Sequence, residues 1–106
     1  MITMDQIKNL SNRIASLFHP DKIILFGSYA YGNPGTNSDV DLLVILPFTG
    51  NNFRKSLEIL NESKPGFMVD ILARRPDDTE MRYSSGDPLI REALDKGIIL
   101  YESNRC

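Results

Sequence analysis

One stretch of the chain, residues 23–46, constrains the fold more than any other part: it reads IILFGSYAYGNPGTNSDVDLLVIL. A glycine and a serine follow an apolar strand, and a second strand opens with Asp39-Val40-Asp41. Because side chains alternate along a strand, we expect the two acids on one face and Val40 on the other. The residues that follow Asp41 are all apolar up to Leu46, which is typical of an interior strand covered on both faces.

Asp39 and Asp41 would repel each other where a buried strand begins. Such a pair is costly unless a cation lies between the carboxylates. Hard divalent ions such as Mg²⁺ are held by few carboxylates and share their other positions with water and substrate phosphate. The alternative is a pair of solvated acids at a strand end. Ser38, directly before them, either orients the acids through its hydroxyl or only satisfies a backbone group.

Gly27 and Ser28 follow the strand expected over residues 22–26. Glycine permits a tight turn, and the free N–H groups of a following short helix, together with the Ser28 hydroxyl, suit a phosphate. Ser28 could equally be a helix N-cap, and the two interpretations are compatible. A phosphate binder and metal ligands on adjacent elements are the two halves of a nucleoside-triphosphate site.

A third acid, Asp70, lies inside an apolar segment that predicts a strand over residues 67–73. An acid in such a strand needs a partner, and Arg74 could provide one as an ion pair. If this strand instead lies beside the strand that carries Asp41, then Asp70 completes a set of three carboxylates. The sequence alone does not fix that adjacency.

A Gly-Ser pair, ten intervening residues, an Asp-x-Asp pair and a later strand acid together resemble the nucleotidyltransferase superfamily of the polymerase-beta type. The resemblance covers about residues 3–101, nearly the whole chain. The small size makes the chain similar to the minimal nucleotidyltransferases (MNT), many of which are antitoxins paired with an all-helical HEPN-type ribonuclease toxin.

The resemblance implies transfer of AMP from ATP with two Mg²⁺ ions. The resemblance also implies that Asp39 and Asp41 bind both metals. Asp70 binds the metal that activates the acceptor and could take the acceptor's proton. Gly27 and Ser28 hold the β- and γ-phosphates, and Ser38 belongs to the same nucleotide-binding set.

The chain departs from these relatives at Tyr29 and Tyr31, because relatives often carry arginine at one or both positions. An arginine there can pair with the triphosphate, whereas tyrosine offers one hydroxyl and no charge. The basic residues that could substitute are Lys22, Lys55, Arg74 and Arg82.

Helical periodicity and capping residues predict helices over residues 3–18, 51–63 and 88–96, while residues 74–84 fit either a short helix or a loop. The expected buried faces consist of Ile7, Leu10, Ile14 and Leu17 in the first helix, Phe53, Leu57 and Leu60 in the second, and Leu89, Ile90, Ala93 and Leu94 in the third. With a closing strand at 98–101, helices alternate with short strands, which indicates an α/β layer. The resemblance adds that the small sheet is mixed, with the acids on its open side.

A length of 106 residues predicts one domain over residues 1–106, with little room for a second domain that binds an acceptor. A net charge of −2 without a basic run argues against a large nucleic-acid footprint. The one cysteine is Cys106, which fits a reducing cytoplasm. We expect neither a signal peptide nor a membrane span, because the N-terminal pattern and the apolar run lengths fit neither.

Without an acceptor domain, either a partner supplies the acceptor or catalysis has been lost. Three hypotheses follow. The first is an enzyme that adenylylates and silences a HEPN-type toxin protein. The second is a catalytically weak module that neutralises its partner by contact alone, which the two tyrosines favour. The third is a nucleotidyltransferase that acts on a small molecule or nucleic acid.

Overall fold

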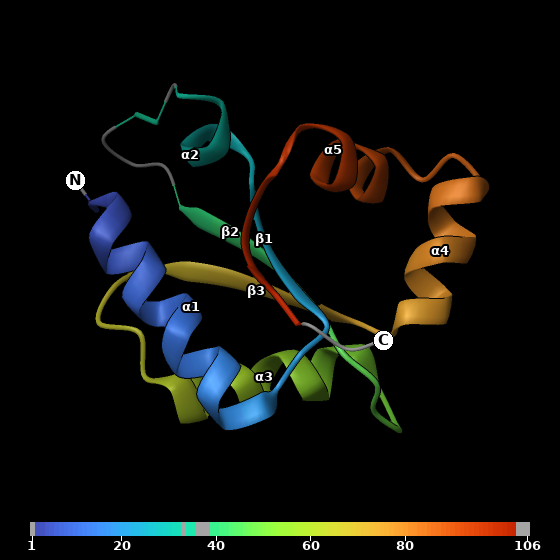
Figure 1. Cartoon of the computed structure of the whole chain (residues 1–106), viewed down its shortest axis with the longest axis horizontal. Coiled ribbons are helices and arrows are strands. Elements are labelled where there is room, and N and C mark those ends of the chain that lie inside the picture. Colours follow the sequence, from blue (N-terminus) through green and yellow to red (C-terminus); the bar gives the residue numbers. More distant parts are fainter. Residues whose placement is uncertain (1, 33, 36–38, 104–106) are drawn as a thin grey trace.

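A computed structural model describes residues 2–32, 34–35 and 39–103 of the chain. One mixed sheet in the order β3-β2-β1-β4 carries helices on both faces (Figure 1). The strands are β1 (Lys22–Phe26), β2 (Val40–Ile45), β3 (Val69–Arg74) and β4 (Ile98–Glu102). The helices are α1 (Met4–Phe18), α2 (Ser28–Tyr31), α3 (Asn52–Ser63), α4 (Pro76–Ser84) and α5 (Pro88–Lys96). The α/β architecture predicted from the sequence is therefore confirmed, and residues 76–84 are helical.

Strand direction decides which strand ends meet. β1 is antiparallel to both β2 and β4, whereas β2 and β3 are parallel and are connected through α3. The end of β1 and the beginnings of β2 and β3 therefore lie at the same end of the sheet. Phe26 pairs with Asp41, and Asp41 pairs with Asp70.

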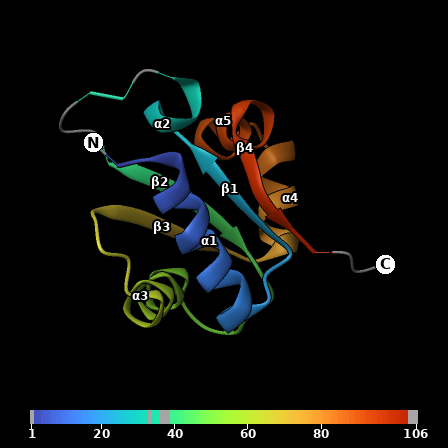
Figure 2. The same cartoon turned by 60° about the vertical axis from the view of Figure 1, so that its left-hand side comes forward.

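One face of the sheet is covered by α1 and α3, which lie side by side (Figure 2). Its core consists of Ile7, Leu10 and Ile14 from α1, Ile59 from α3, and alternate strand residues that include Val40, Leu42 and Val44. The opposite face is covered by α5, whose Ile90 and Ala93 pack with the intervening strand residues Ile24, Phe26, Leu43 and Ile45. Apolar side chains of β2 thus contribute to both cores, as the all-apolar run predicts.

The helices begin where the sequence predicts. Thr3 caps α1 as a capping box: its hydroxyl accepts from the Gln6 backbone N–H at 3.2 Å, and its own N–H donates to Gln6 Oε1 at 2.7 Å. Asp87 caps α5 by accepting from the N–H groups of Leu89 and Ile90. Gly97 follows the last residue of α5 with an extended backbone, and only glycine fits there, because a Cβ would collide with backbone and side-chain atoms of α5 and β1.

The predicted buried faces are wrong at four positions, since Leu17, Phe53, Leu57 and Leu89 are exposed. α3 instead buries Ile59 and Ser63, one turn apart, and the Ser63 carbonyl accepts from Arg13 Nε of α1 at 3.0 Å. α3 lies along β3, which is the outermost strand on one side of the sheet. No further strand therefore covers the outer apolar side chains of α3. Among the described residues, every helix is too short or too polar to cross a membrane.

Candidate functional site

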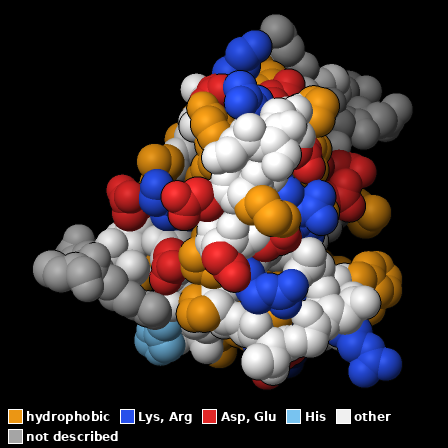
Figure 3. Space-filling model, turned by 90° about the vertical axis from the view of Figure 1, so that its right-hand side faces the viewer, with side chains coloured by type: hydrophobic (Ala, Val, Ile, Leu, Met, Phe, Trp, Pro, Cys, Tyr) orange, Lys and Arg blue, Asp and Glu red, His pale blue; other side chains and the backbone are white. Residues whose placement is uncertain are grey.

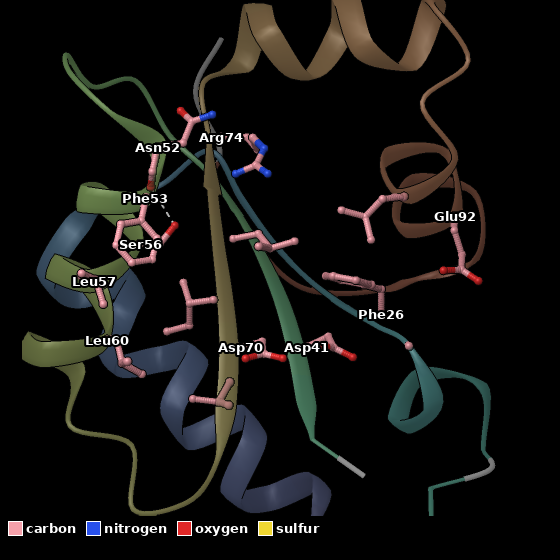
Figure 4. Close-up of a pocket in the computed structure, with 15 residues that line it drawn as sticks. Phe26, Asp41, Asn52, Phe53, Ser56, Leu57, Leu60, Asp70, Arg74 and Glu92 are labelled. Carbon is pink, nitrogen blue, oxygen red and sulfur yellow. Dashed lines mark hydrogen bonds between the residues drawn. The ribbon is translucent and has the colours of Figure 1, made fainter.

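Two carboxylates meet on the face of the sheet that α5 covers. Asp41 in β2 and Asp70 in β3 are direct partners across the parallel ladder, and neighbouring strands lie about 4.8 Å apart. Figure 4 shows the two carboxylates side by side, between β3 and the turn that follows Phe26. The inference that the strand of Asp70 lies beside the strand of Asp41 is confirmed.

The acids are accessible because α5 covers only part of this face. Asp41, Leu43 and Ile45 alternate with Leu42 and Val44 and so share one face of β2. Helix α5 packs over Leu43 and Ile45, which are buried, whereas Asp41 at the beginning of the strand is only partly buried. Strand alternation together with a short covering helix therefore produces an open acidic site beside an apolar core.

Gly27 lies directly against Asp41. Its φ is +78°, which favours glycine, and a Cβ at this position would overlap Asp41 Oδ2. Gly27 is the N-cap of α2, and its carbonyl accepts from the N–H groups of Ala30 and Tyr31. Ser28 is the first helical residue, so the alternative interpretation of Ser28 as the N-cap is wrong by one position. The missing Cβ lets the turn and the carboxylate approach closely.

Asp39 precedes β2 and is exposed, while Ser38 lies outside the described residues. Within the described ranges, no three His, Cys, Asp or Glu residues gather closely enough to hold a metal ion. The structure thus brings together Asp41 and Asp70 but does not add Asp39 to form a three-carboxylate cluster. Asp70 and Arg74 form no ion pair, and Arg74 Nη1 donates to the Ala73 carbonyl at 2.9 Å.

Burial raises the pKa of Asp41 to about 6, and the carboxylates of Asp70, Asp39 and Glu92 add to the rise. Two carboxylates in this position disfavour full ionisation, which a bound cation would relieve. A donor set made only of carboxylate oxygens suits a hard divalent ion, and Mg²⁺ commonly needs only one or two carboxylates besides substrate phosphate. The residues present therefore fit a Mg²⁺ site.

The acids line a cleft of about 750 Å³ that passes around the edge strand β3 (Figure 4). The part beyond β3, toward α3, is lined by the uncharged residues Asn52, Phe53, Ser56, Leu57, Leu60, Val69 and Ile71. The part over the α5 side is lined by Phe26, Gly27, Asp41, Asp70, Leu72, Arg74, Leu89 and Glu92. All the charged lining residues are in the second group.

Tyr29 and Tyr31 stand where the resemblance to nucleotidyltransferases leads us to expect arginine. Tyr29 packs against the main core. Tyr31 is partly exposed and faces α5: burial raises the pKa of its hydroxyl, and the nearby Glu92 carboxylate adds to the rise. Tyr31 therefore lies at the site, next to an acid rather than in a basic pocket.

Of the basic residues that could replace an arginine, Arg74 is the one that lines the cleft, at the end of β3 away from Asp70 (Figure 4). The others are held by acids elsewhere. Lys22 pairs with Glu102 at 3.4 Å, Lys55 with Glu58 at 3.2 Å, and Arg82 with Asp78 at 3.2 Å and Asp87 at 3.4 Å. Figure 3 shows basic and acidic side chains next to each other on one face of the molecule.

The sequence pattern did not indicate that Glu92, Phe53 and Leu57 line the cleft. Glu92 lies on the exposed side of α5, three positions after Leu89, and only the packing of α5 on β1 brings it to the acids. Phe53 and Leu57 were assigned to the core because their spacing is helical and apolar. Ser56 is a polar residue between them, and its hydroxyl accepts from the Ala73 N–H at 2.9 Å, so it is a signal that this side faces a strand edge.

The sequence model of a family described as "Nucleotidyltransferase domain" matches residues 7–100. No curated protein matches the sequence. A crystal structure of a toxin–antitoxin with AMP-PNP is similar in fold, with a TM-score of 0.64 and 23% identity over 92% of this chain and 74% of the other.

Two further structures show the same fold. A proposed nucleotidyltransferase from Sulfolobus solfataricus has a TM-score of 0.65 and 16% identity over 95% of this chain and 81% of its own. A chain in the structure of a tri-AMPylated Shewanella oneidensis HEPN toxin in complex with an MNT antitoxin has a TM-score of 0.51 and 20% identity, over 94% of this chain and 74% of its own. The nucleotidyltransferase fold expected from the sequence is confirmed.

Proposed function

The chain belongs to the nucleotidyltransferase domain family, and from this premise we propose that it transfers AMP from ATP to a hydroxyl group of a partner protein. The observation that carries the proposal is the pairing of Asp41 with Asp70 directly against the Gly27 turn. These groups could act on a nucleotide together because they lie at the same end of the sheet.

In this proposal Asp41 and Asp70 are the principal ligands for Mg²⁺, and Asp39 joins them when nucleotide is bound. Two ions bound there would supply positive charge against the attacking and the leaving oxygens. Gly27 and Ser28 hold the β- and γ-phosphates through backbone N–H groups and the serine hydroxyl. Ser38 would belong to the same set, although it lies outside the described residues.

The transfer forms a bond between the acceptor oxygen and the α-phosphorus of ATP and breaks the bond from that phosphorus to the β-phosphate oxygen. Pyrophosphate leaves, and the acceptor becomes an AMP ester. Asp70, on the outer strand, lies where it can accept the hydroxyl proton as the new bond forms. The Gly27 turn and Asp41 hold the nucleotide on the opposite side.

We propose a HEPN-type helical toxin as the partner, with AMP addition silencing it in the cytoplasm. Two neighbours in fold support this: one is a toxin–antitoxin with AMP-PNP, and the other contains a tri-AMPylated HEPN toxin with its MNT antitoxin. The cleft also leaves one side open toward α3, where a macromolecule could approach.

A second candidate function is neutralisation of the partner by contact alone. The specific observation in its favour is Tyr31, which faces Glu92 where relatives often carry an arginine for the triphosphate. In that case the acids would be dispensable for inhibition.

The test is label transfer from α-labelled ATP with Mg²⁺ in a lysate of the source cells, using the wild-type chain and Asp39→Ala. We expect one labelled protein band with the wild type and none with the variant. A folded wild-type chain that labels nothing, with the partner present, would favour contact alone. Label on a free small molecule or on nucleic acid would favour the third class of acceptor.

A further inference from the structure

The outer edge of β3 is open next to the acids. β3 is the terminal strand of the sheet and pairs only with β2. The Arg74 carbonyl accepts from Leu46 N–H on the β2 side at 3.0 Å, whereas the Ala73 N–H donates outward to Ser56 Oγ at 2.9 Å. By alternation, the backbone groups of Val69 and Ile71 also point outward. No described residue bonds these outward groups, and both residues line the cleft, although Val69 is only 9% and Ile71 only 8% exposed.

An exposed strand edge is a template for a further strand. Here the edge is short and reaches from the Ala73–Ser56 bond to the beginning of β3. Asp70 lies between Val69 and Ile71, with its side chain on the α5 side (Figure 4). A strand added at this edge would run about 4.8 Å from Asp70.

The two sides of such a strand would meet different chemistry. The side that faces α3 would meet only uncharged lining, including Phe53, which is 69% exposed, and Leu57, which is 40% exposed. The other side would meet the carboxylates of Asp41, Asp70 and Glu92. Charge complementarity therefore selects a segment with apolar side chains on one face and uncharged hydroxyl-bearing or basic side chains on the other.

We propose that the acceptor enters as an extended segment of the partner protein that pairs with β3, so that a Ser, Thr or Tyr lies beside Asp70 and its two neighbours pack against Phe53 and Leu57. This inference rests on the proposed function, because it names the acceptor of the same site. The expected recognition pattern is apolar, hydroxyl, apolar. Main-chain hydrogen bonds to Val69 and Ile71 give affinity, and the α3 side chains give specificity.

A second copy of the chain is the less favourable occupant. Antiparallel pairing of β3 with its own copy around Asp70 would bring two Asp70 carboxylates together on one face of the sheet. Like charges on adjacent strands destabilise pairing. A partner segment with a hydroxyl in that position has no such cost.

The test uses the full chain and a pool of short synthetic peptides with a central Ser, Thr or Tyr between Val, Ile, Leu or Phe. The control pool has the same residues, reordered so that the alternation is lost. Amide hydrogen exchange of Val69 and Ile71, followed by NMR without ATP, reports strand pairing directly. We expect protection of both amides by the alternating pool only.

Phe53→Glu places a charge in the apolar part of the cleft, and Met81→Glu on α4 is its matched control, because Met81 is likewise exposed (60%). Both substitutions are at exposed helix positions, so the fold should be kept. We expect Phe53→Glu to weaken peptide protection by about tenfold or more, and Met81→Glu to leave it unchanged.

Four outcomes overturn the docking mode, and a fifth rejects the proposed function on which it rests. The first is no protection by the alternating pool, and the second is equal binding by Phe53→Glu and the wild type. The third is protection that depends on protein concentration without peptide, which would identify a second copy as the occupant. The fourth is partner labelling in the lysate at the wild-type rate by Phe53→Glu, which rejects the docking mode but keeps the proposed function. Peptide protection with no label transfer to any acceptor would instead reject the proposed function and the acceptor role of the segment.

Discussion

The two faces of the sheet are built from the same strands, but helices cover one face completely and the other only in part. On the α1 and α3 face, Val40, Leu42 and Val44 of β2 are completely buried under two helices. On the α5 face, Leu43 and Ile45 are buried, while Asp41 lies open in the cleft. Helix α5, with Tyr83 of α4 packed beside it, covers the second face only in part.

The difference shows how one small sheet combines a fully covered core with accessible carboxylates. Alternation along β2 sends consecutive residues to opposite faces, so a charge at position 41 leaves the core beside it intact. The covered face supplies the hydrophobic free energy of folding, and the uncovered strand beginnings carry groups that would be costly inside. Adjacent residues of one strand should therefore respond to substitution in different ways.

The largest effect is expected from Asp41→Asn. If the open face carries the chemistry, transfer of labelled AMP should fall by about 10³-fold or more, because one carboxylate for the metal is lost. The melting temperature should stay the same or rise, since charge repulsion with Asp70 is relieved. Rates come from quantitative label transfer and melting temperatures from circular dichroism.

Asp77→Asn, an exposed acid in the first turn of α4, is the control and should transfer at the wild-type rate. Wild-type transfer by Asp41→Asn would show that the open face is not the catalytic one.

Leu42→Ala tests the covered face next to it. Its side chain is fully buried, so truncation should lower the free energy of unfolding by about 2–5 kcal/mol, through lost burial and the cavity left behind. Urea denaturation followed by circular dichroism measures this. Below the unfolding temperature, transfer by the folded variant should stay within a few fold of the wild type. A loss below about 1 kcal/mol would contradict the division between the two faces.

Much of this architecture follows from local pattern. The Thr3 capping box, the Asp87 cap and the apolar run after Asp41 each predict an element that the structure contains, because each depends on residues close in sequence. Gly27 and Asp41 were singled out for the same reason. That residues 1–106 form one domain stays a prediction.

The rest depends on packing that no local pattern encodes. Phe53 and Leu57 have the spacing of a buried face, but β3 is the last strand at that edge, and a sheet edge leaves outer side chains uncovered. Glu92 reaches the acids only because α5 packs on β1. Asp39 matches the Asp-x-Asp pattern, yet it lies outside β2 and is exposed. Strand order and helix placement are tertiary results.

The Asp41 pKa gives a third test of the comparison, through pH. The carboxyl titrates near 3.8 without its environment and near 6 in the fold. Below pH 3.8 Asp41 is protonated in both the folded and the unfolded state, so it does not lower the free energy of unfolding. Above about pH 6 it is ionised in both states, and the free energy of unfolding is lowered by the full amount. Stability should therefore fall as pH rises through this window, by about 2 kcal/mol after allowance for solvent screening of this partly exposed group.

Thermal melts of the wild type and Asp41→Asn across this range isolate the effect, because only the difference between them reports Asp41. Mg²⁺ should raise the wild-type melting temperature more at pH 7 than at pH 4, since only the ionised carboxylate binds it. A difference that does not vary with pH would mean that the carboxyl behaves as a solvated acid.

The smallest expected effect compares how much Asp70 and Glu92 each raise the pKa of Asp41. Asp70→Asn removes both a repelling charge and a hydrogen-bond partner, whereas Glu92→Gln removes a charge with the smallest effect on Asp41. Both should lower the Asp41 pKa, and Asp70→Asn should lower it further. NMR titration of the Asp41 carboxyl carbon measures each value. If Glu92→Gln had the larger effect, the charge from α5 would outweigh the cross-strand pair, and the open face would be organised by its covering helix rather than by strand pairing.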